Sequence, residues 1–95
     1  MSSDTSPLDL IVARFPEHRD SLGRLHTRSE SFRSLCEDVR DCLAAIETWT
    51  RSTAEEAPAY REEFAILLQE LDEELLEEVK NEGELIDYRT RKRGL

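Results

Sequence analysis

Apolar residues recur at alternating steps of three and four through the middle of the chain, between positions 32 and 49. This spacing places them along one side of an α-helix. The stripe consists of Phe32, Leu35, Val39, Cys42, Ile46 and Trp49. Cys36 and Leu43 lie beside it and widen it to roughly a third of the helix circumference, more than the seam of a two-stranded coiled coil. We therefore expect this helix to contact more than one neighbour.

A short helix is predicted before this stripe, over residues 7–14. Ser6 is suited to cap its first turn, Pro7 needs no backbone donor there, and Asp9 places a carboxylate near the positive end of the helix. Together these three residues mark a helix start.

Pro16 should interrupt this helix, because it removes a backbone hydrogen-bond donor and disfavours helical geometry in the residue before it. A second helix is expected from Pro16 to about His26. Residues 27–31 are rich in Ser and Thr, which predicts a turn in which Ser29 or Ser31 caps the next helix.

The central helix is expected over about residues 30–51, followed by a connection that reaches Pro58. Residues 54–57 suit either a helical turn or a loop, and the sequence leaves both open. A long helix then begins at Ala59. Its apolar face consists of Tyr60, Phe64, Leu67, Leu68, Leu71, Leu75 and Val79.

The last helix should stop near Asn81 and Gly83, because these residue types often end helices. The sequence thus predicts one helical domain over 1–83 and a partly disordered tail over 84–95. The fold class is all-α: an antiparallel, coiled-coil-like helical hairpin with short N-terminal helices packed on it. The basic end of the tail is formed by Arg89, Arg91, Lys92 and Arg93.

Composition narrows the range of partners. The 95 residues include 22 acids and 13 bases, a formal net charge of −9, so the chain as a whole should repel nucleic acids and anionic membranes. The sequence shows neither a signal-peptide pattern nor an apolar run that would span a membrane, which predicts a cytoplasmic protein. So short a chain buries a small share of its surface, and self-association is the obvious supplement to its stability.

Acids and bases are unevenly distributed near the C-terminus. Between Glu62 and Glu84 there are ten acids and one base, Lys80. This surface is most simply a solvated helix face; a docking face for a basic partner is the alternative. A divalent-ion site lacks the glycine and alternating ligands of a calcium loop. The basic tail is either an arm for nucleic acid or a terminal cluster that stays solvated or pairs with acids.

No residue set predicts catalysis, a cofactor or a metal site. His18 and His26 lack the Glu-x-x-His spacing of helical metal sites, and the neighbours of His18 fit a phosphate-accepting histidine only loosely. We expect both histidines to pack at helix interfaces. Cys36 and Cys42 lie about 9 Å apart along one helix axis, too far for a disulfide within the chain. We interpret them as reduced core thiols, with an intermolecular disulfide or a reactive thiol as alternatives.

A further sequence pattern begins with the motif Phe15-Pro16-Glu17-His18-Arg19-Asp20. It continues with Leu25, Phe32-x-x-Leu35, apolar Cys42 and Ile46, and the segment Leu71-Asp72-Glu73-Glu74. In these residues, over about 15–79, the chain resembles the YdcH-like family of small bacterial proteins. The resemblance implies a coiled-coil-like helical hairpin without an established activity, so no catalytic residues carry over. The chain departs from the family in its extra N-terminal segment, its acidic last helix and its basic tail.

Two functions are consistent with these observations, and neither is enzymatic. The first is a small homo-oligomeric module for protein–protein interaction, with a second copy as partner, or another protein bound through the acidic helix. Its candidate contact residues are large apolar side chains: Phe32, Ile46, Trp49, Phe64, Ile66, Leu71 and Leu76. Ile66 and Leu76 are included because their spacing directs them away from the main apolar face. The alternative is a nucleic-acid- or ribosome-associated accessory protein that uses the basic tail. Nucleic acid is the less favoured partner, and no membrane partner is expected.

Overall fold

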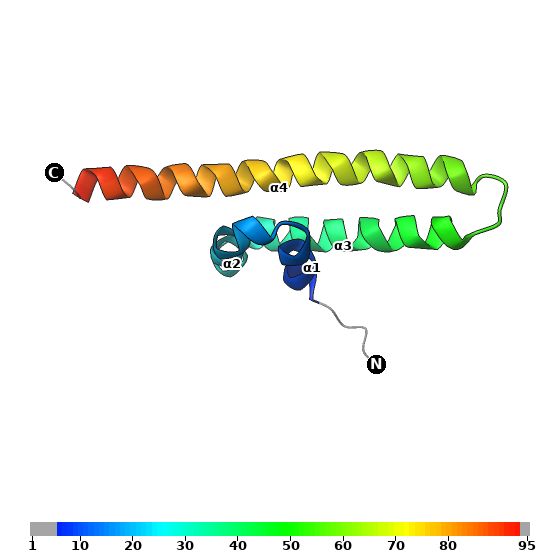
Figure 1. The fold of residues 1–95 in the computed structure, drawn as a ribbon, viewed down its shortest axis with the longest axis horizontal. Helices are drawn as coiled ribbons and strands as arrows, with labels where there is room; N and C mark the ends of the chain where they lie inside the picture. Colours follow the sequence, from blue (N-terminus) through cyan, green and yellow to red (C-terminus); the bar gives the residue numbers. More distant parts are fainter. Residues whose placement is uncertain (1–5, 94–95) are drawn as a thin grey trace.

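The computed structural model describes the backbone of residues 6–93 and the side chains of residues 6–83. This part of the chain is all-α, with two long antiparallel helices and short N-terminal helices packed on them (Figure 1). The predicted fold class is therefore confirmed. In chain order the elements are α1 (Pro7–Arg14), the 3-10 turn η1 (Pro16–His18), α2 (Arg19–Arg28), α3 (Glu30–Arg51) and α4 (Ala57–Arg93).

The N-terminal helices follow their predicted signals closely. The Ser6 hydroxyl accepts a hydrogen bond from the backbone N–H of Asp9 at 3.1 Å, which caps α1. The helix ends at Arg14, and Phe15 leaves the helical region with φ −132° and ψ 64°. Pro16 then begins the single turn η1, so the predicted break is confirmed.

The connection between α2 and α3 is shorter than predicted. The helix α2 continues to Arg28, so the expected turn over 27–31 shrinks to Ser29. The Ser29 hydroxyl accepts from the backbone N–H of Phe32 at 3.1 Å and caps α3. One residue with a capping side chain is enough to change the direction of the chain here.

The helix α4 is longer than predicted at both ends. It begins at Ala57, which assigns residues 54–56 to the connection, and it continues to Arg93. The stop expected at Asn81 and Gly83 is wrong. A glycine inside a helix costs about 1 kcal/mol relative to alanine, which good helix formers on both sides offset. The partly disordered tail and its basic end fall on residues 84–95, whose side chains lie outside the described residues.

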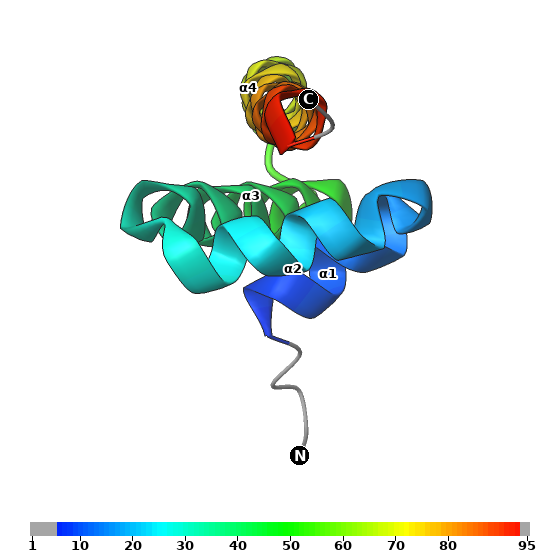
Figure 2. The ribbon, with the colours of Figure 1, turned by 90° about the vertical axis from the view of Figure 1, so that its left-hand side faces the viewer.

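The hydrophobic core lies where the N-terminal helices meet the hairpin. The helix α2 runs across the hairpin, since Figure 1 views it nearly end-on and Figure 2 views it from the side. The helix α3 therefore contacts α1, α2 and α4, which confirms that its wide stripe needs several neighbours. The largest fully buried side chains come from all four α-helices: Ile11, Leu22, Phe32, Cys36, Val39 and Leu75.

The other end of the hairpin, residues 42–71, is here called the distal half. Within the described part of the chain only α3 and α4 pass through it (Figure 1). The rings of Trp49 and Tyr60 stack across it with centroids 4.6 Å apart. With no third helix, Tyr60, Ile66 and Leu67 stay exposed.

Among the described side chains, three ion pairs fasten the N-terminal helices to α4. Arg14 donates two hydrogen bonds to the carboxylate of Asp72, at 2.6 and 2.7 Å. Arg24 donates to both oxygens of Glu82, at 2.6 and 3.2 Å, and the Arg28 guanidinium lies 3.7 Å from the same carboxylate. Glu82 is buried, and the hydrogen bond from Arg24 holds the pKa of its carboxyl below the ordinary value of 4.5. Two acids of the acidic helix therefore position α1 and α2.

Candidate functional site

A groove follows the line along which α3 and α4 pack against each other. Two adjoining pockets form it, and both are lined by Asp38. The groove takes its α3 side from residues 31–42 and its α4 side from residues 64–78, which run in the opposite direction. It is the candidate functional site because apolar and charged side chains line one concave surface.

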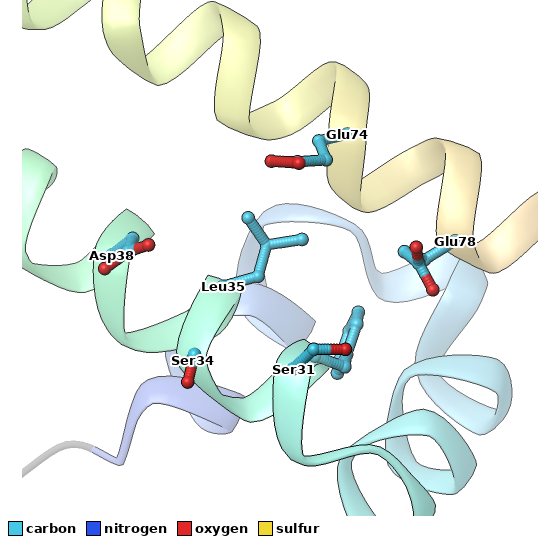
Figure 3. Close-up of a pocket in the computed structure, with 7 residues that line it drawn as sticks. Ser31, Ser34, Leu35, Asp38, Glu74 and Glu78 are labelled. Atoms are coloured by element: carbon cyan, nitrogen blue, oxygen red, sulfur yellow. The ribbon is translucent and has the colours of Figure 1, made fainter.

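The section of the groove nearer the core is shown in Figure 3. It is an open pocket of about 180 Å³. Leu35 points from α3 toward α4, while Glu74 and Glu78 approach from α4 and Asp38 lies on the α3 side (Figure 3). Ser31 and Ser34 complete the α3 side of this section. An apolar floor is thus bordered by acids from both helices.

The section in the distal half is more apolar. It is an open pocket of about 250 Å³. Leu67 contributes the most accessible apolar surface here, because 42% of the residue is exposed. The other lining residues are Asp38, Asp41, Cys42, Phe64 and Leu71. The exposed Leu67 and the half-buried Phe64 thus leave apolar surface of this section open to solvent.

Within the side chains that the structure describes, few of the acids along the groove have basic partners. Asp41 contacts Arg40 at 3.2 Å, an exposed pair of small energetic value. Among the side chains of residues 6–83, no base forms an ion pair with Asp38, Glu74 or Glu78. The groove therefore carries uncompensated negative charge beside apolar surface.

Two of the contact residues predicted from the sequence pack in the hydrophobic core of their own chain. Phe32 is 1% exposed and packs in the core, and it also lines the section of the groove nearer the core. Leu76 is partly buried against the same core, although its spacing predicted a side chain directed away from the apolar face. The N-terminal helices cover a second side of α4, and this cover explains the correction for Leu76.

The remaining predicted contact residues lie in the distal half. Phe64 and Leu71 line the groove. Trp49 is half-buried against Tyr60, and Ile46 is half-buried on α3. Ile66 is 53% exposed but does not line the groove, because it lies nine residues from the buried Leu75 and so on the opposite side of α4.

Sequence reasoning missed the residues that give the groove its character. Leu67 was assigned to the apolar face of α4, yet it was not recognised as a contact residue. Its position was a usable signal, because it lies three residues after Phe64 and four before Leu71, on the flank of the stripe. Asp38, Glu74 and Glu78 carry no sequence signal that separates them from other surface acids.

Both cysteines are buried and free, as their interpretation as core thiols predicted. Burial raises the pKa of the Cys36 thiol to about 11, and burial likewise raises the pKa of Cys42. The Cys42 thiol also donates a hydrogen bond to the carbonyl oxygen of Phe64 at 3.0 Å, which links α3 to α4 inside the groove.

The thiols are therefore expected to react slowly in the folded protein. At pH 8, labelling by an aromatic disulfide reagent should be on the order of 100-fold slower in buffer than in concentrated urea, because burial suppresses the thiolate and blocks access. Absorbance of the released thiolate measures both rates, with the urea-unfolded chain as the control. Rapid labelling of the folded protein would contradict this expectation.

His18 lies at the N-terminal end of α2. His18 is half-buried beside an open surface pocket of about 540 Å³ that also includes Arg19 and Ser21. The Ser21 hydroxyl accepts a hydrogen bond from Arg24 at 3.2 Å. The ion-pair contact of the imidazole is with Glu17, at 3.9 Å. Among the described side chains, the Ser21 hydroxyl and the His18 imidazole thus contact different partners.

Among residues 6–83, no three His, Cys, Asp or Glu side chains converge as a metal site would require. Over the same described residues, no helix combines the length and apolar character needed to cross a membrane. Comparison with family models, with curated proteins and with solved structures gives no match. The groove is the candidate functional site of the described residues.

Proposed function

We propose that this chain is a cytoplasmic, homo-oligomeric helical module for protein–protein interaction without catalytic activity. The observation that carries the proposal is the exposed apolar surface of the distal half. Leu67 is 42% exposed and Tyr60 41% exposed, on helices that α1 and α2 do not cover there. A small domain gains stability when another chain buries such surface. The helical hairpin implied by the resemblance to YdcH-like proteins agrees with this role.

The choice of a second copy as partner follows from the size of the domain and the continuity of the groove. The described residues form a body 63 Å long but only 22 Å thick, so much of its apolar surface is near solvent. An isologous contact along the hairpin buries the same groove on both copies at once. Self-association therefore covers the exposed leucine without requiring a second gene product.

Substitution of Leu67 by lysine tests this proposal. Sedimentation velocity at concentrations on the order of 100 μM should show the wild-type chain as a dimer or higher oligomer. Leu67→Lys should weaken association by roughly tenfold or more, because a charge replaces buried apolar surface. Circular dichroism should show unchanged helix content.

The matched control is Ile66→Lys, which adds the same charge at the neighbouring, more exposed position outside the groove. It should associate as the wild-type chain does. A wild-type chain that sediments as a folded monomer over this concentration range would contradict the proposed function.

A further inference from the structure

We infer that the groove between α3 and α4 binds the basic tail, residues 84–95, of a second copy of this chain. The inference rests on the proposed function, since it requires self-association. It adds the two surfaces that meet and the charge that directs them toward each other.

The groove selects a basic segment with some apolar side chains. Its floor includes Leu35 and the exposed Leu67, which favour apolar contact. Its borders carry Asp38 on α3 and Glu74 and Glu78 on α4, and no base among residues 6–83 pairs with these three carboxylates. A helical segment with bases beside apolar residues complements such a surface in both charge and polarity.

The tail is the segment of this chain with that composition. Four of the chain's 13 bases fall within residues 89–93, and apolar Leu85, Ile86 and Tyr88 precede them. The lengths also agree. The helical part of the tail, residues 84–93, spans about 15 Å, which fits within the α3 side of the groove, residues 31–42, at about 18 Å with 1.5 Å per residue.

The tail cannot enter the groove of its own chain. The helix α4 continues without interruption to Arg93, so it carries the tail beyond the end of the groove that Ser31 and Glu78 border. Figure 1 shows this end of α4 projecting past α2 and the start of α3. From Glu82 to Arg93 the helix advances about 16 Å away from the core. The tail could reach the groove of its own chain only if α4 broke, whereas it can bind the groove of a second copy with α4 intact.

A two-fold arrangement satisfies both copies together. The α4 side of the groove and the tail lie on the same helix, at residues 64–78 and 84–93. When two α4 helices pair in opposite directions, each tail lies over the groove of the other copy. The contact closes as a dimer, which is the commonest symmetry for identical chains.

Charge reversal on each surface tests the inference in the full-length chain. The groove variant is Asp38→Lys with Glu74→Lys, and the tail variant is Arg89→Glu with Arg93→Glu. A third chain carries all four substitutions. The control is Glu73→Lys with Glu77→Lys, which changes the net charge by the same amount as the groove variant. Both positions are exposed, and each lies two residues from the buried Leu75, which places them on the outer face of α4.

Sedimentation should resolve these variants clearly. The groove and tail variants should each dissociate roughly tenfold or more readily than the wild-type chain, since each places like charges together. The chain with all four substitutions should associate with an affinity within about threefold of the wild-type chain. A mixture of the groove variant and the tail variant should form heterodimers. The control should associate as the wild-type chain does. Higher salt should weaken the wild-type dimer by screening these contacts. Circular dichroism should confirm that all variants remain folded.

Other results would overturn the inference in distinguishable ways. A wild-type oligomer that neither reversal nor salt affects would exclude the tail as occupant while leaving the proposed function intact. If the chain with all four substitutions associated no more tightly than the groove variant or the tail variant, a direct contact between the two surfaces would also be excluded. A folded wild-type monomer would remove both proposals. An oligomer unchanged in the tail variant, together with loss of binding to a labelled single-stranded RNA, would assign the tail to nucleic acid instead.

Discussion

Replacing Phe32 with alanine is expected to lower the free energy of unfolding by about 3–5 kcal/mol. Phe32 is 1% exposed and packs in the cluster that joins all four α-helices. Truncation leaves a cavity that these helices fill only in part. Urea denaturation followed by far-ultraviolet circular dichroism measures the loss. For so small a domain the change is a large fraction of the total stability.

The matched control is Ile66→Ala, because Ile66 is 53% exposed and lies outside both the core and the groove. Its unfolding free energy should change by no more than about 0.5 kcal/mol. The denaturation of both variants should be measured at two protein concentrations, because association adds to apparent stability. A Phe32→Ala chain that keeps its stability but loses its self-association would assign Phe32 to the contact between chains rather than to the core.

Acidification is expected to destabilise the fold through Glu82. Because Arg24 donates to this carboxylate, the folded-state pKa of Glu82 lies below its ordinary value of 4.5. The folded state therefore binds this proton less readily than the unfolded state does. The contribution to stability is complete above about pH 4.5 and is lost as the pH falls through the folded-state pKa.

Glu82→Gln isolates this effect. At neutral pH it should lower the free energy of unfolding by about 1–2 kcal/mol, a moderate value because the Arg24 end of the pair is half exposed and screened. Between pH 5 and pH 3 the variant should lose less stability than the wild-type chain. Glu77→Gln, at an exposed position, should follow the wild-type curve. Parallel acid curves for Glu82→Gln and the wild-type chain would assign the pH dependence to other carboxyls.

The parts of the fold that the sequence predicted well are those with local signals. The spacing of apolar residues in α3 defined a helix over 30–51, which matches its observed bounds. Ser6 and Pro16 marked the start and the end of α1 because capping and proline geometry act within a few residues. The width of the α3 stripe predicted several neighbours, and three helices contact it.

The parts that the sequence did not predict depend on distant residues. Glu82 continues the apolar line of Leu75 and Val79, and its pairing with Arg24 spans 58 positions in the chain. An acid on an apolar line is a usable signal for a buried ion pair, but the line alone does not identify the base. The sequence likewise predicts a single acidic face on α4. In the structure, Asp72 and Glu82 pair with bases of the N-terminal helices, whereas Glu74 and Glu78 line the groove.

The helix stop at Gly83 was mispredicted for a similar reason. A propensity argument weighs the glycine against its neighbours, but it omits the anchoring of Glu82 by Arg24 and Arg28 one residue earlier. The groove itself was outside the reach of the sequence, since its concave shape depends on how α3 and α4 lie against each other. The sequence supplied its apolar lining but not its acidic borders.

The uneven cover of the hairpin also has a dynamic consequence. Four helices enclose the core end, whereas the end that contains Trp49 and Tyr60 is held by two helices and one stacked aromatic pair. Amide hydrogens should therefore exchange with solvent fastest near the α3–α4 connection and slowest around Val39 and Leu75, because local opening costs least where fewest groups must separate. A bound second chain would reveal its footprint as slowed exchange along the groove, including residues 64–71 of the looser end, even where the backbone does not move.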